Sequence, residues 1–280
     1  MIDFEETEFQ LRTEKVQKNM FENNVDAILL CTEPEVRYFT GFRSLFWQSP
    51  TRPWFVVIPK NGKPIAIIPD IGRDLMARTW IDDIRTWPSP RREDEGISLL
   101  VEVLEGAKNI GILMGEEASL RMPLEDFEKL KSKINGTFSD CSKIIKKVRL
   151  IKSEKEILIL KNICSVANRS FDRANRLFFS GQPLNEAFRE FKITLLEEGA
   201  EEVPYLVGGA GRDGYVDVIS PPSSKPLENG DILMLDTGST LKGYFCDFDR
   251  NWAIGTASDI AKRAYSKLHK VTELALDEIR

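Results

Sequence analysis

The spacing of apolar residues changes along the chain, and each spacing predicts a different kind of element. In the first half, short apolar runs such as Val25–Leu30 and Trp54–Ile58 predict strands. They stand between segments, such as residues 5–22, in which apolar residues recur every three or four positions and predict helices. Strands that alternate with helices indicate an α/β domain.

A β-hairpin is predicted where Asn61 and Gly62 separate the apolar runs Trp54–Ile58 and Pro64–Ile68, because Asn-Gly suits a tight turn between strands. The first domain is completed by helices predicted at residues 73–80, 96–104 and 123–132 and by a strand predicted at 109–114.

The chain changes character at the basic stretch Ser142–Ser153, which we interpret as a solvated linker or helix start. A long helix is predicted at Glu154–Phe179, because Ser153 is a good capping residue and acidic residues follow it. We place a domain boundary near residue 148, which gives domains at 1–148 and 149–280.

The last part of the chain combines helices with a β-rich stretch. A helix is predicted at 185–198, and strands are predicted at 205–207, 215–219, 231–236 and 244–252. The segment 259–280 predicts an amphipathic helix, whose apolar face carries Ile260, Ala264, Leu268, Val271 and Leu274.

Composition narrows the functional classes. The chain has 280 residues, 42% hydrophobic content and a formal net charge of -5. An acidic chain is a poor general binder of nucleic acid, which is bound through basic surfaces. No apolar run is long enough for a membrane span, and the acidic amino terminus is unlike a signal peptide. We therefore expect a cytoplasmic protein that binds neither nucleic acid nor membrane. Its four cysteines are too widely spaced for a zinc knuckle, and we expect them to be reduced.

Candidate chemistry is concentrated in two predicted strands that each carry an acid, Asp236 and Asp247. A hairpin of these strands brings both carboxylates to one side of a sheet, beside apolar residues such as Leu235 and Phe248. Two acids held together repel each other unless a cation neutralises them, and divalent metals do so. The alternative is a pair of solvated turn residues.

A glycine motif, GAGRDG at residues 209–214, matches the spacing of a dinucleotide-binding loop. That function needs a helix directly after the glycines. Because residues 215–219 have a strand pattern instead, we reject nucleotide binding and expect a loop near a substrate pocket or a plain glycine turn.

Four ordered segments identify the chain as a member of the creatinase/prolidase/aminopeptidase P (M24) family. The stretch 236–250 resembles the first metal-binding hairpin of that family, with the pattern D-x-G-x4-G-Y-x2-D-x-[T/D]-R. The other segments are PEVRYFTGF at 34–42, RLIKSEKEI at 149–157 and LENGD at 227–231. The resemblance implies an α/β creatinase-type N-terminal domain followed by the first part of an α+β "pita-bread" catalytic domain.

The same resemblance implies an activity and a metal site. Asp236 and Asp247 would bind two divalent ions (Mn, Co, Zn or Fe), with Asp247 bridging them. The reaction would be hydrolysis of a C–N bond in a short peptide or small molecule, in a homodimer. Trp47, Arg52 and Trp54 suit recognition of a small charged substrate, and the alternative for them is packing at an interface.

The sequence departs from the family at two places. Ile219 stands where peptidases of the family carry a histidine that helps to bind substrate; Asp217 nearby is a weak substitute. Asp249 stands where threonine is common, and could support a metal ligand or pair with Arg250. We assign no role to the single histidine, His269.

The family's further ligands, one His and two Glu, lie beyond residue 280, so we expect the 280-residue chain to be inactive. The departures leave two alternatives open. One is a lyase or a hydrolase of a small non-peptide molecule on the same scaffold, and the other is a non-catalytic binding protein.

Overall fold

The computed structural model describes residues 3–49 and 52–279, which form two compact units, Met1–Lys152 and Ser153–Arg280. The elements of the first unit are α1 (Glu6–Glu22), β1 (Ala27–Leu30), α2 (Glu33–Thr40), η1 (Leu45–Gln48), β2 (Phe55–Pro59), β3 (Ile65–Pro69), η2 (Asp70–Gly72), α3 (Arg73–Met76), β4 (Ile84–Trp87), α4 (Ile97–Leu104), β5 (Asn109–Ile112), α5 (Leu124–Lys133), β6 (Thr137–Asp140) and α6 (Ser142–Leu150). Those of the second unit are α7 (Glu154–Asp172), α8 (Ala174–Leu177), α9 (Leu184–Glu197), β7 (Glu202–Arg212), β8 (Asp231–Leu241), β9 (Tyr244–Ala253) and α10 (Asp259–Ile279).

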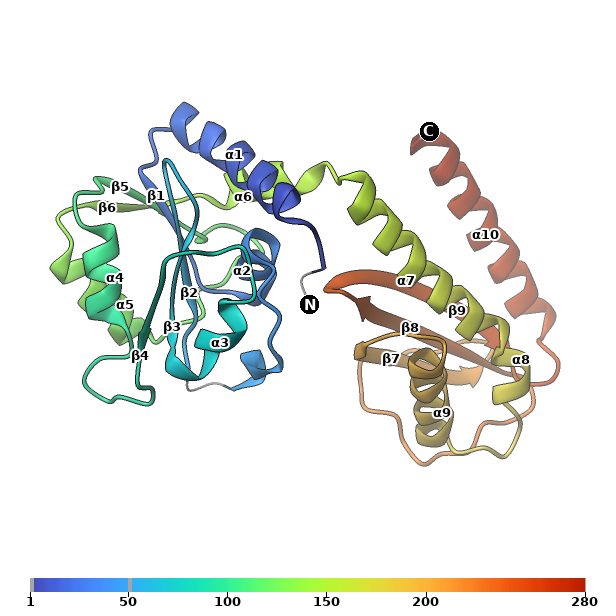
Figure 1. The fold of residues 1–280 in the computed structure, drawn as a ribbon. Coiled ribbons are helices and arrows are strands. Elements are labelled where there is room, and N and C mark those ends of the chain that lie inside the picture. Colours follow the sequence, from blue (N-terminus) through green and yellow to red (C-terminus); the bar gives the residue numbers. More distant parts are fainter. Residues whose placement is uncertain (1–2, 50–51, 280) are drawn as a thin grey trace. The chain divides into compact units, whose positions relative to one another are not determined.

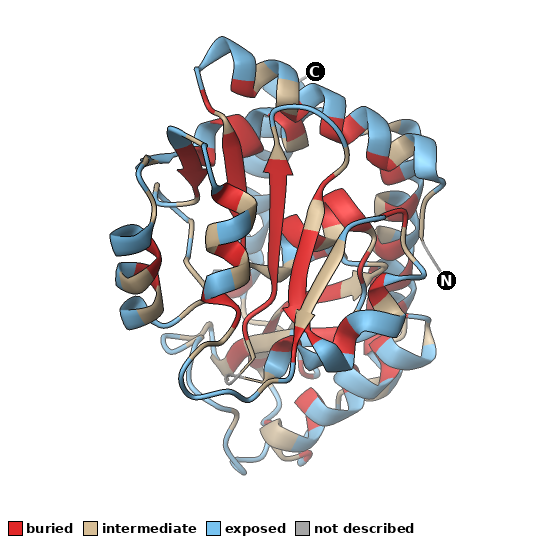
Figure 2. Ribbon diagram, turned by 60° about the vertical axis from the view of Figure 1, so that its left-hand side comes forward, coloured by how far each residue is buried: buried red, intermediate tan, exposed pale blue. Residues whose placement is uncertain are grey.

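The first unit is a three-layer α/β domain around a mixed six-stranded sheet of order β4-β3-β2-β1-β5-β6. Alternate residues of each strand enter different cores, because successive side chains point to opposite faces. Ile28 and Leu30 pack with the helices α1 and α6, whereas Ala27 and Leu29 pack with α4 and α5. Figure 1 shows helices on both faces of this sheet, and Figure 2 shows its strands as the most buried part of the unit.

The predicted hairpin of the first unit is confirmed. Strands β2 and β3 pair antiparallel, and Gly62 in their connection adopts a positive φ of 87°. Positive φ is natural for glycine and strained for most other residues. The helix predicted at 5–22 is α1, and its apolar residues Phe9, Val16 and Met20 are buried.

Several features of the first unit differ from the sequence prediction. Strands β4 and β6 lie at the two edges of the sheet and carry few apolar residues, so the spacing of apolar residues does not reveal them. The basic stretch 142–153 is mostly helix α6, whose apolar residues Ile145 and Val148 enter the core. The helix predicted at 73–80 ends at Met76, whose carbonyl accepts a hydrogen bond from the Thr79 hydroxyl.

The second unit packs helices against one face of a three-stranded antiparallel sheet of order β7-β8-β9. Leu233 and Leu235 of β8 and Cys246 of β9 point into a core with Ile163 of α7 and Phe191 of α9. The opposite face of the sheet carries the acidic residues. Figure 1 shows α7 and α9 beside the sheet and α10 at the end of the chain.

Three predictions for the second unit are wrong. The helix predicted at 154–179 ends at Asp172, and the short helix α8 follows it. Residues 215–219 form no strand, and the strand predicted at 205–207 extends through the glycine motif to Arg212 as β7. Gly209 and Gly211 therefore belong to a strand, which is neither of the loops expected for them, and Gly214 lies in the loop that follows.

All four cysteines are free thiols, as expected. Within the described ranges, no helix combines the length and apolar character needed to cross a bilayer.

Helix α7 begins with a capping box. The Ser153 hydroxyl accepts from the Glu156 amide, and the Glu156 carboxylate accepts from the Ser153 amide at 2.8 Å. Two amides at the helix start are thereby satisfied, and Ser153 is the capping residue that the sequence predicts.

Replacing Ser153 with alanine removes one of these bonds. We expect Ser153→Ala to lower the free energy of unfolding of the second unit by about 1 kcal/mol, measured by urea denaturation. Ser266→Ala on the exposed helix α10 is the matched control and should change it by less than about 0.5 kcal/mol. Equal effects would contradict a specific role for the cap.

Candidate metal centre

The register of β8 and β9 places the two predicted metal ligands on one face of the sheet. Asp236 is paired with Asp249, and Gly238 is paired with Asp247. Directly paired residues and residues two positions apart share a face of a sheet. Asp236, Asp247 and Asp249 therefore all project from the face opposite the apolar core.

Gly238 makes room for this arrangement. A β-carbon at this position would lie 1.8 Å from Cζ of Phe245 and 2.6 Å from Cε1 of Tyr205. Because real β-carbons do not approach other atoms so closely, only glycine lets these two rings cover the strand between the acidic residues.

Tyr205 of β7 holds the two carboxylates together. Its hydroxyl lies 2.7 Å from Oδ1 of Asp247 and 3.0 Å from Oδ1 of Asp236. Partial burial, together with these two carboxylates, raises the pKa of the Tyr205 hydroxyl well above its usual value, so the group stays a proton donor.

The sequence prediction missed Tyr205. The information that identifies Tyr205 is its pairing with Gly238, which puts its side chain on the same face as Asp236. Using it required the register of β7 against β8, which the apolar spacing of the glycine-rich β7 does not give.

Asp249 is the third acid of this face. Partial burial, together with the charges of Asp236 and Asp247, raises the pKa of the Asp249 carboxyl, whereas Arg250 lowers it. The Arg250 guanidinium donates to the backbone carbonyl of Asp249 at 2.7 Å, and it lies over the rings of Phe248 and Phe171. It packs, therefore, on apolar rings of the core side of the sheet.

The loop after β7 contains Ile219, which stands at the position of the family's substrate-binding histidine, and Asp217, the weak substitute for that histidine. A hydrogen bond from the Ser220 side chain, followed by those from the amides of Ser220 and Ile219, lowers the pKa of the Asp217 carboxyl. These hydrogen bonds form a local turn in place of the strand expected at 215–219. Ile219 itself is 81% exposed.

The glycines of β7 let this loop lie against the strand. A β-carbon on Gly209 would come 2.5 Å from the carbonyl oxygen of Asp217, and one on Gly211 would come 2.5 Å from that of Gly214. Gly209 lies two positions from Val207, which is paired with Asp236. The loop therefore runs along the acidic face of the sheet.

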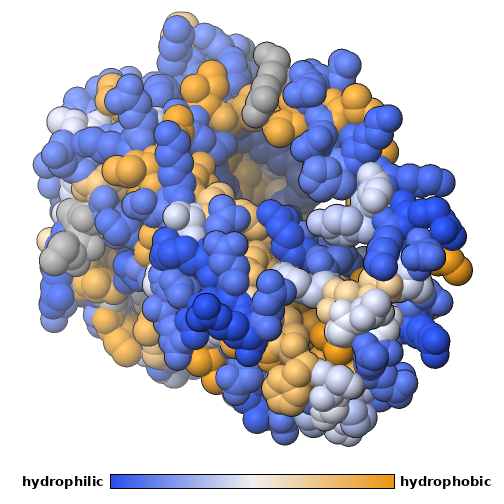
Figure 3. Space-filling model, turned by 90° about the vertical axis from the view of Figure 1, so that its right-hand side faces the viewer, coloured by the Kyte–Doolittle hydropathy of each residue, from blue (hydrophilic) through white to orange (hydrophobic). Residues whose placement is uncertain are grey.

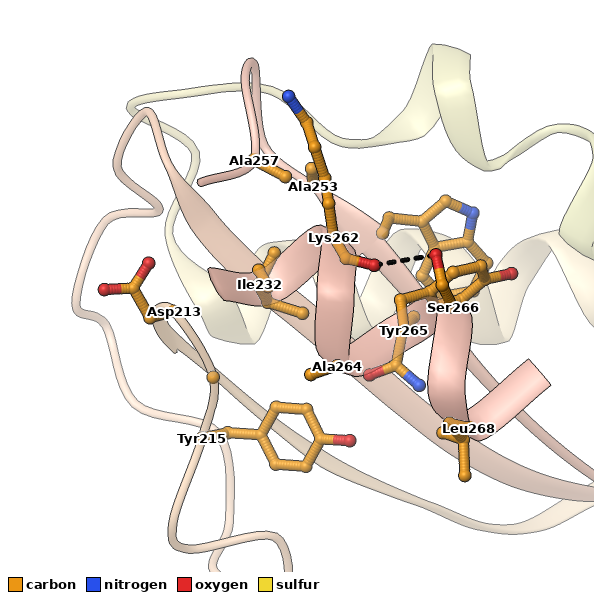
Figure 4. Close-up of a pocket in the computed structure, with 14 residues that line it drawn as sticks. Asp213, Tyr215, Ile232, Ala253, Ala257, Lys262, Ala264, Tyr265, Ser266 and Leu268 are labelled. Carbon is orange, nitrogen blue, oxygen red and sulfur yellow. Dashed lines mark hydrogen bonds between the residues drawn. The ribbon is translucent and has the colours of Figure 1, made fainter. Parts of the chain in front are cut away.

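A pocket of about 620 Å³ opens on the same face, beyond Asp249. Ile232, Asn251 and Ala253 form its floor, and helix α10 and the loop at Tyr215 form its walls. Figure 4 shows the ring of Tyr215 along one side and the side chain of Lys262 directed away. The lining is largely apolar with a few polar groups, as is common for small-molecule sites.

The substrate residues predicted in the first unit are mostly buried. Trp47 and Trp54 belong to its core with ring centroids 6.0 Å apart, and Arg121 donates to the carbonyls of Trp47 and Arg52 at 3.0 Å. Both tryptophans therefore pack inside the first unit, whereas the alternative interpretation placed them at an interface. The indole N–H groups of both tryptophans and Nε of Arg52 find no hydrogen-bond partner among the described residues.

The acidic face offers the kind of ligand atom that a divalent metal prefers, but too few such ligands to complete a site. Carboxylate oxygens are good ligands for such ions, and Asp236 and Asp247 converge on one hydroxyl. Yet residues 3–49 and 52–279 hold no group of three or more His, Cys, Asp or Glu side chains arranged for a metal. The exposed His269 is 4.0 Å from Glu273 of its own helix. The described residues can supply part of a ligand set.

Comparison with known proteins assigns both units. Residues 12–151 match the Creatinase/Prolidase N-terminal domain, and residues 159–280 match metallopeptidase family M24. The chain belongs to the creatinase/prolidase-like M24 family. These two matches confirm the predicted family and fold class and assign the chain to a metal-dependent metallopeptidase family.

Individual relatives agree with this assignment. An Xaa-Pro dipeptidase of Pyrococcus horikoshii is 24% identical over 272 residues, which are 96% of this chain and 71% of the relative. The prolidase structure from the same organism has a TM-score of 0.79 at 23% identity and covers 95% of this chain and 71% of that one. A prolidase from Thermococcus sibiricus has a TM-score of 0.81 at 20% identity, with the same coverage. At these identities the structures establish the fold.

The acidic face makes a testable contribution to stability. Because the pKa of Asp249 is raised in the folded chain, its ionisation costs more there than in the unfolded chain. The free energy of unfolding therefore falls as the pH rises past 3.8, the ordinary value. Asp249→Asn should raise the melting temperature by roughly 1–3 °C at pH 7, and the gain should vanish below the ordinary pKa.

Thermal unfolding at the two pH values checks this prediction. Asp172→Asn, on the exposed end of α7, is the matched control and should leave the melting temperature unchanged. A loss of stability in Asp249→Asn at pH 7 would mean that this carboxylate makes favourable contacts in the free protein.

Proposed function

We propose that Asp236 and Asp247 are ligands of a centre of two divalent metal ions, and that this centre serves the hydrolysis of a C–N bond. The observation that supports this proposal is the convergence of two carboxylates, from adjacent strands, on the single hydroxyl of Tyr205. Carboxylates so close repel each other in the free protein, and a cation between them removes that repulsion.

The neighbouring residues have supporting roles in this proposal. Asp247, on β9, would hold the ions together with Asp236, while Tyr205 would orient both carboxylates through its hydrogen bonds. Asp249 adds negative charge opposite Asp236. The positive charge of the Arg250 guanidinium, on the other face of the sheet, partly offsets that negative charge. When bound, the ions (Mn, Co, Zn or Fe) supply Lewis-acid activation of a substrate carbonyl and of the attacking water.

The substrate class follows from the relatives that are named for their activity. Because they include an Xaa-Pro dipeptidase and prolidases, we infer a short peptide with proline after the scissile bond. The apolar floor of the neighbouring pocket, with Ile232 and Ala253, suits a proline ring. Trp47, Arg52 and Trp54 are secondary candidates for substrate contact in a homodimer, which the family resemblance favours.

The position of Ile219 favours a second candidate function. An isoleucine side chain neither donates a proton nor forms a hydrogen bond with the substrate carbonyl. It therefore cannot do what the histidine of family peptidases does at this position, which is to help bind the substrate. Asp217 is a poor replacement for the histidine, because Oδ1 of its carboxylate already accepts hydrogen bonds from two amides of its own turn. This favours a hydrolase or lyase of a small non-peptide molecule on the same scaffold.

The small number of ligands limits how tightly the 280-residue chain can bind metal. Divalent metals take about four to six ligands, and the described residues bring two acids to one point. We infer that one His and two Glu complete the centre in active family members, and that this chain alone binds metal weakly without turnover. Its free, largely buried thiols suit the reducing cytoplasm.

Titration with Mn²⁺ by calorimetry tests the ligand assignment. We expect weak binding by the chain, and a loss of at least about tenfold in affinity, or 1.4 kcal/mol, in Asp236→Asn and in Asp247→Asn. Asp172→Asn is the control and should bind like the unchanged chain.

The possible outcomes separate the enzyme from a binding protein. If Mn²⁺, Co²⁺ and Zn²⁺ all fail to bind above background, the metal assignment is wrong and a non-catalytic role on the same scaffold gains support. If binding survives both aspartate substitutions, the ions occupy a different place.

A further inference from the structure

Three asparagines of the chain are followed directly by glycine, at residues 61–62, 135–136 and 229–230. Asparagine is one of the thermolabile residues of proteins. A glycine after it has no side chain to hinder attack of the next backbone nitrogen on the asparagine amide. The same reactive dipeptide therefore occurs three times, and the structure around each copy decides how readily it reacts.

The copy at Asn229 is held on both sides. Its Oδ1 accepts a hydrogen bond from the Thr256 amide at 3.1 Å, and the Gly230 amide donates to the Ile254 carbonyl at 2.8 Å. A β-carbon on Gly255 would lie 1.9 Å from the same Oδ1, so the side chain also packs against backbone. The attacking nitrogen and the amide under attack are both engaged, and reaction requires local opening first.

The copy at Asn135 is exposed, but the glycine after it is confined. A β-carbon on Gly136 would lie 2.6 Å from the carbonyl oxygen of Ala107 and 3.1 Å from that of Lys108. The next residue, Thr137, begins β6, and its amide donates to the Lys108 carbonyl at 2.8 Å. The backbone therefore has little room to turn the Gly136 nitrogen towards the asparagine side chain.

The copy at Asn61 has neither restraint. Asn61 and Gly62 are both exposed, in the connection between β2 and β3, and a β-carbon on Gly62 would meet no atom within 4 Å. Gln17 of α1 holds the Gly62 carbonyl at 2.8 Å and leaves the amide of that residue unused. Within residues 3–49 and 52–279, the Gly62 amide and the Asn61 side chain have no hydrogen-bond partner.

We propose that Asn61 is a site of spontaneous deamidation, and that the fold makes it the most reactive of the three copies. The Gly62 nitrogen forms a bond to Cγ of Asn61, its proton passes to the leaving amide nitrogen, and the Cγ–Nδ2 bond breaks with release of ammonia. Water then opens the resulting succinimide at either carbonyl, which leaves aspartate or isoaspartate at position 61. Water is the only co-reactant.

The reaction changes the charge of the chain and one contact of its first unit. A carboxylate replaces a neutral amide, so one negative charge is added to the formal net charge of -5. Hydrophilic side chains cover most of the face drawn in Figure 3, and an added exposed carboxylate joins a hydrated surface. Gln17 donates to the carbonyls of both Pro59 and Gly62. Isoaspartate lengthens the backbone between these two carbonyls, so we expect this bridge to be lost.

Incubation of the purified 280-residue chain at mildly alkaline pH tests the proposal. Peptide mapping by mass spectrometry follows the fraction of each asparagine that is converted over time. We expect Asn61 to convert first and Asn135 more slowly. Conversion at Asn61 should be at least about tenfold faster than at Asn229, because two hydrogen bonds must open before Asn229 can react.

The same measurement in guanidinium chloride separates structure from sequence. Unfolding removes the local restraints, so all three asparagines should then convert at similar rates.

Asn61→Gln is the matched variant. A glutamine side chain has to close a larger ring, so the acidic species that ion exchange separates from the unchanged chain should form at least about tenfold more slowly. Because position 61 is exposed, this substitution should leave the fold intact.

Three results would overturn the proposal. They are an unconverted Asn61 in a folded chain whose three asparagines all react when unfolded, conversion at Asn135 or Asn229 as fast as at Asn61, and formation of the acidic species by Asn61→Gln at the rate of the unchanged chain. Because the readouts are mass and charge, none of them depends on the proposed metal chemistry.

Discussion

The second unit depends on the alternation of side chains along β8 and β9. Leu233, Leu235 and Cys246 enter the core beneath α7 and α9, and the residues between them face away from it. A shift of the pairing by one residue would bury the acids and expose the leucines, so the apolar core fixes the register. The packing of the hydrophobic face thus determines which acids meet on the opposite face.

Close acids are tolerated because the structure offers them a shared donor. Two carboxylates at this distance repel each other. A neutral hydroxyl that donates towards both offsets part of this repulsion without introducing a positive charge. The arrangement holds one oxygen atom of each carboxylate close to the same hydroxyl.

Glycine has a different role on this face from the one that its motif suggests. Gly209 and Gly211 resemble part of a phosphate-binding loop in sequence, but they lie in β7 and let the following loop approach the strand directly. Gly238 in β8 lets two aromatic rings cover the backbone beside the acids. The close approach of backbone or aromatic rings therefore explains why glycine stands at all three positions, and a phosphate-binding role is not needed.

Local spacing and linear motifs sufficed to predict the family, the α/β character of the first domain and the hairpin at Gly62. They also sufficed to predict that Asp236 and Asp247 lie on one face of a sheet. They did not reveal the edge strands β4 and β6, whose stability comes from backbone pairing with neighbours distant in sequence.

Tertiary structure alone decided how the remaining parts of the site are arranged. The role of Tyr205 depends on the register between strands some thirty residues apart along the chain. The turn at Asp217 replaced a predicted strand, because its carboxylate captures two amides of its own loop. The exposure of the apolar face of α10 within the described residues is also a tertiary property, since a periodic pattern shows that a helix has an apolar face and does not show what lies against it.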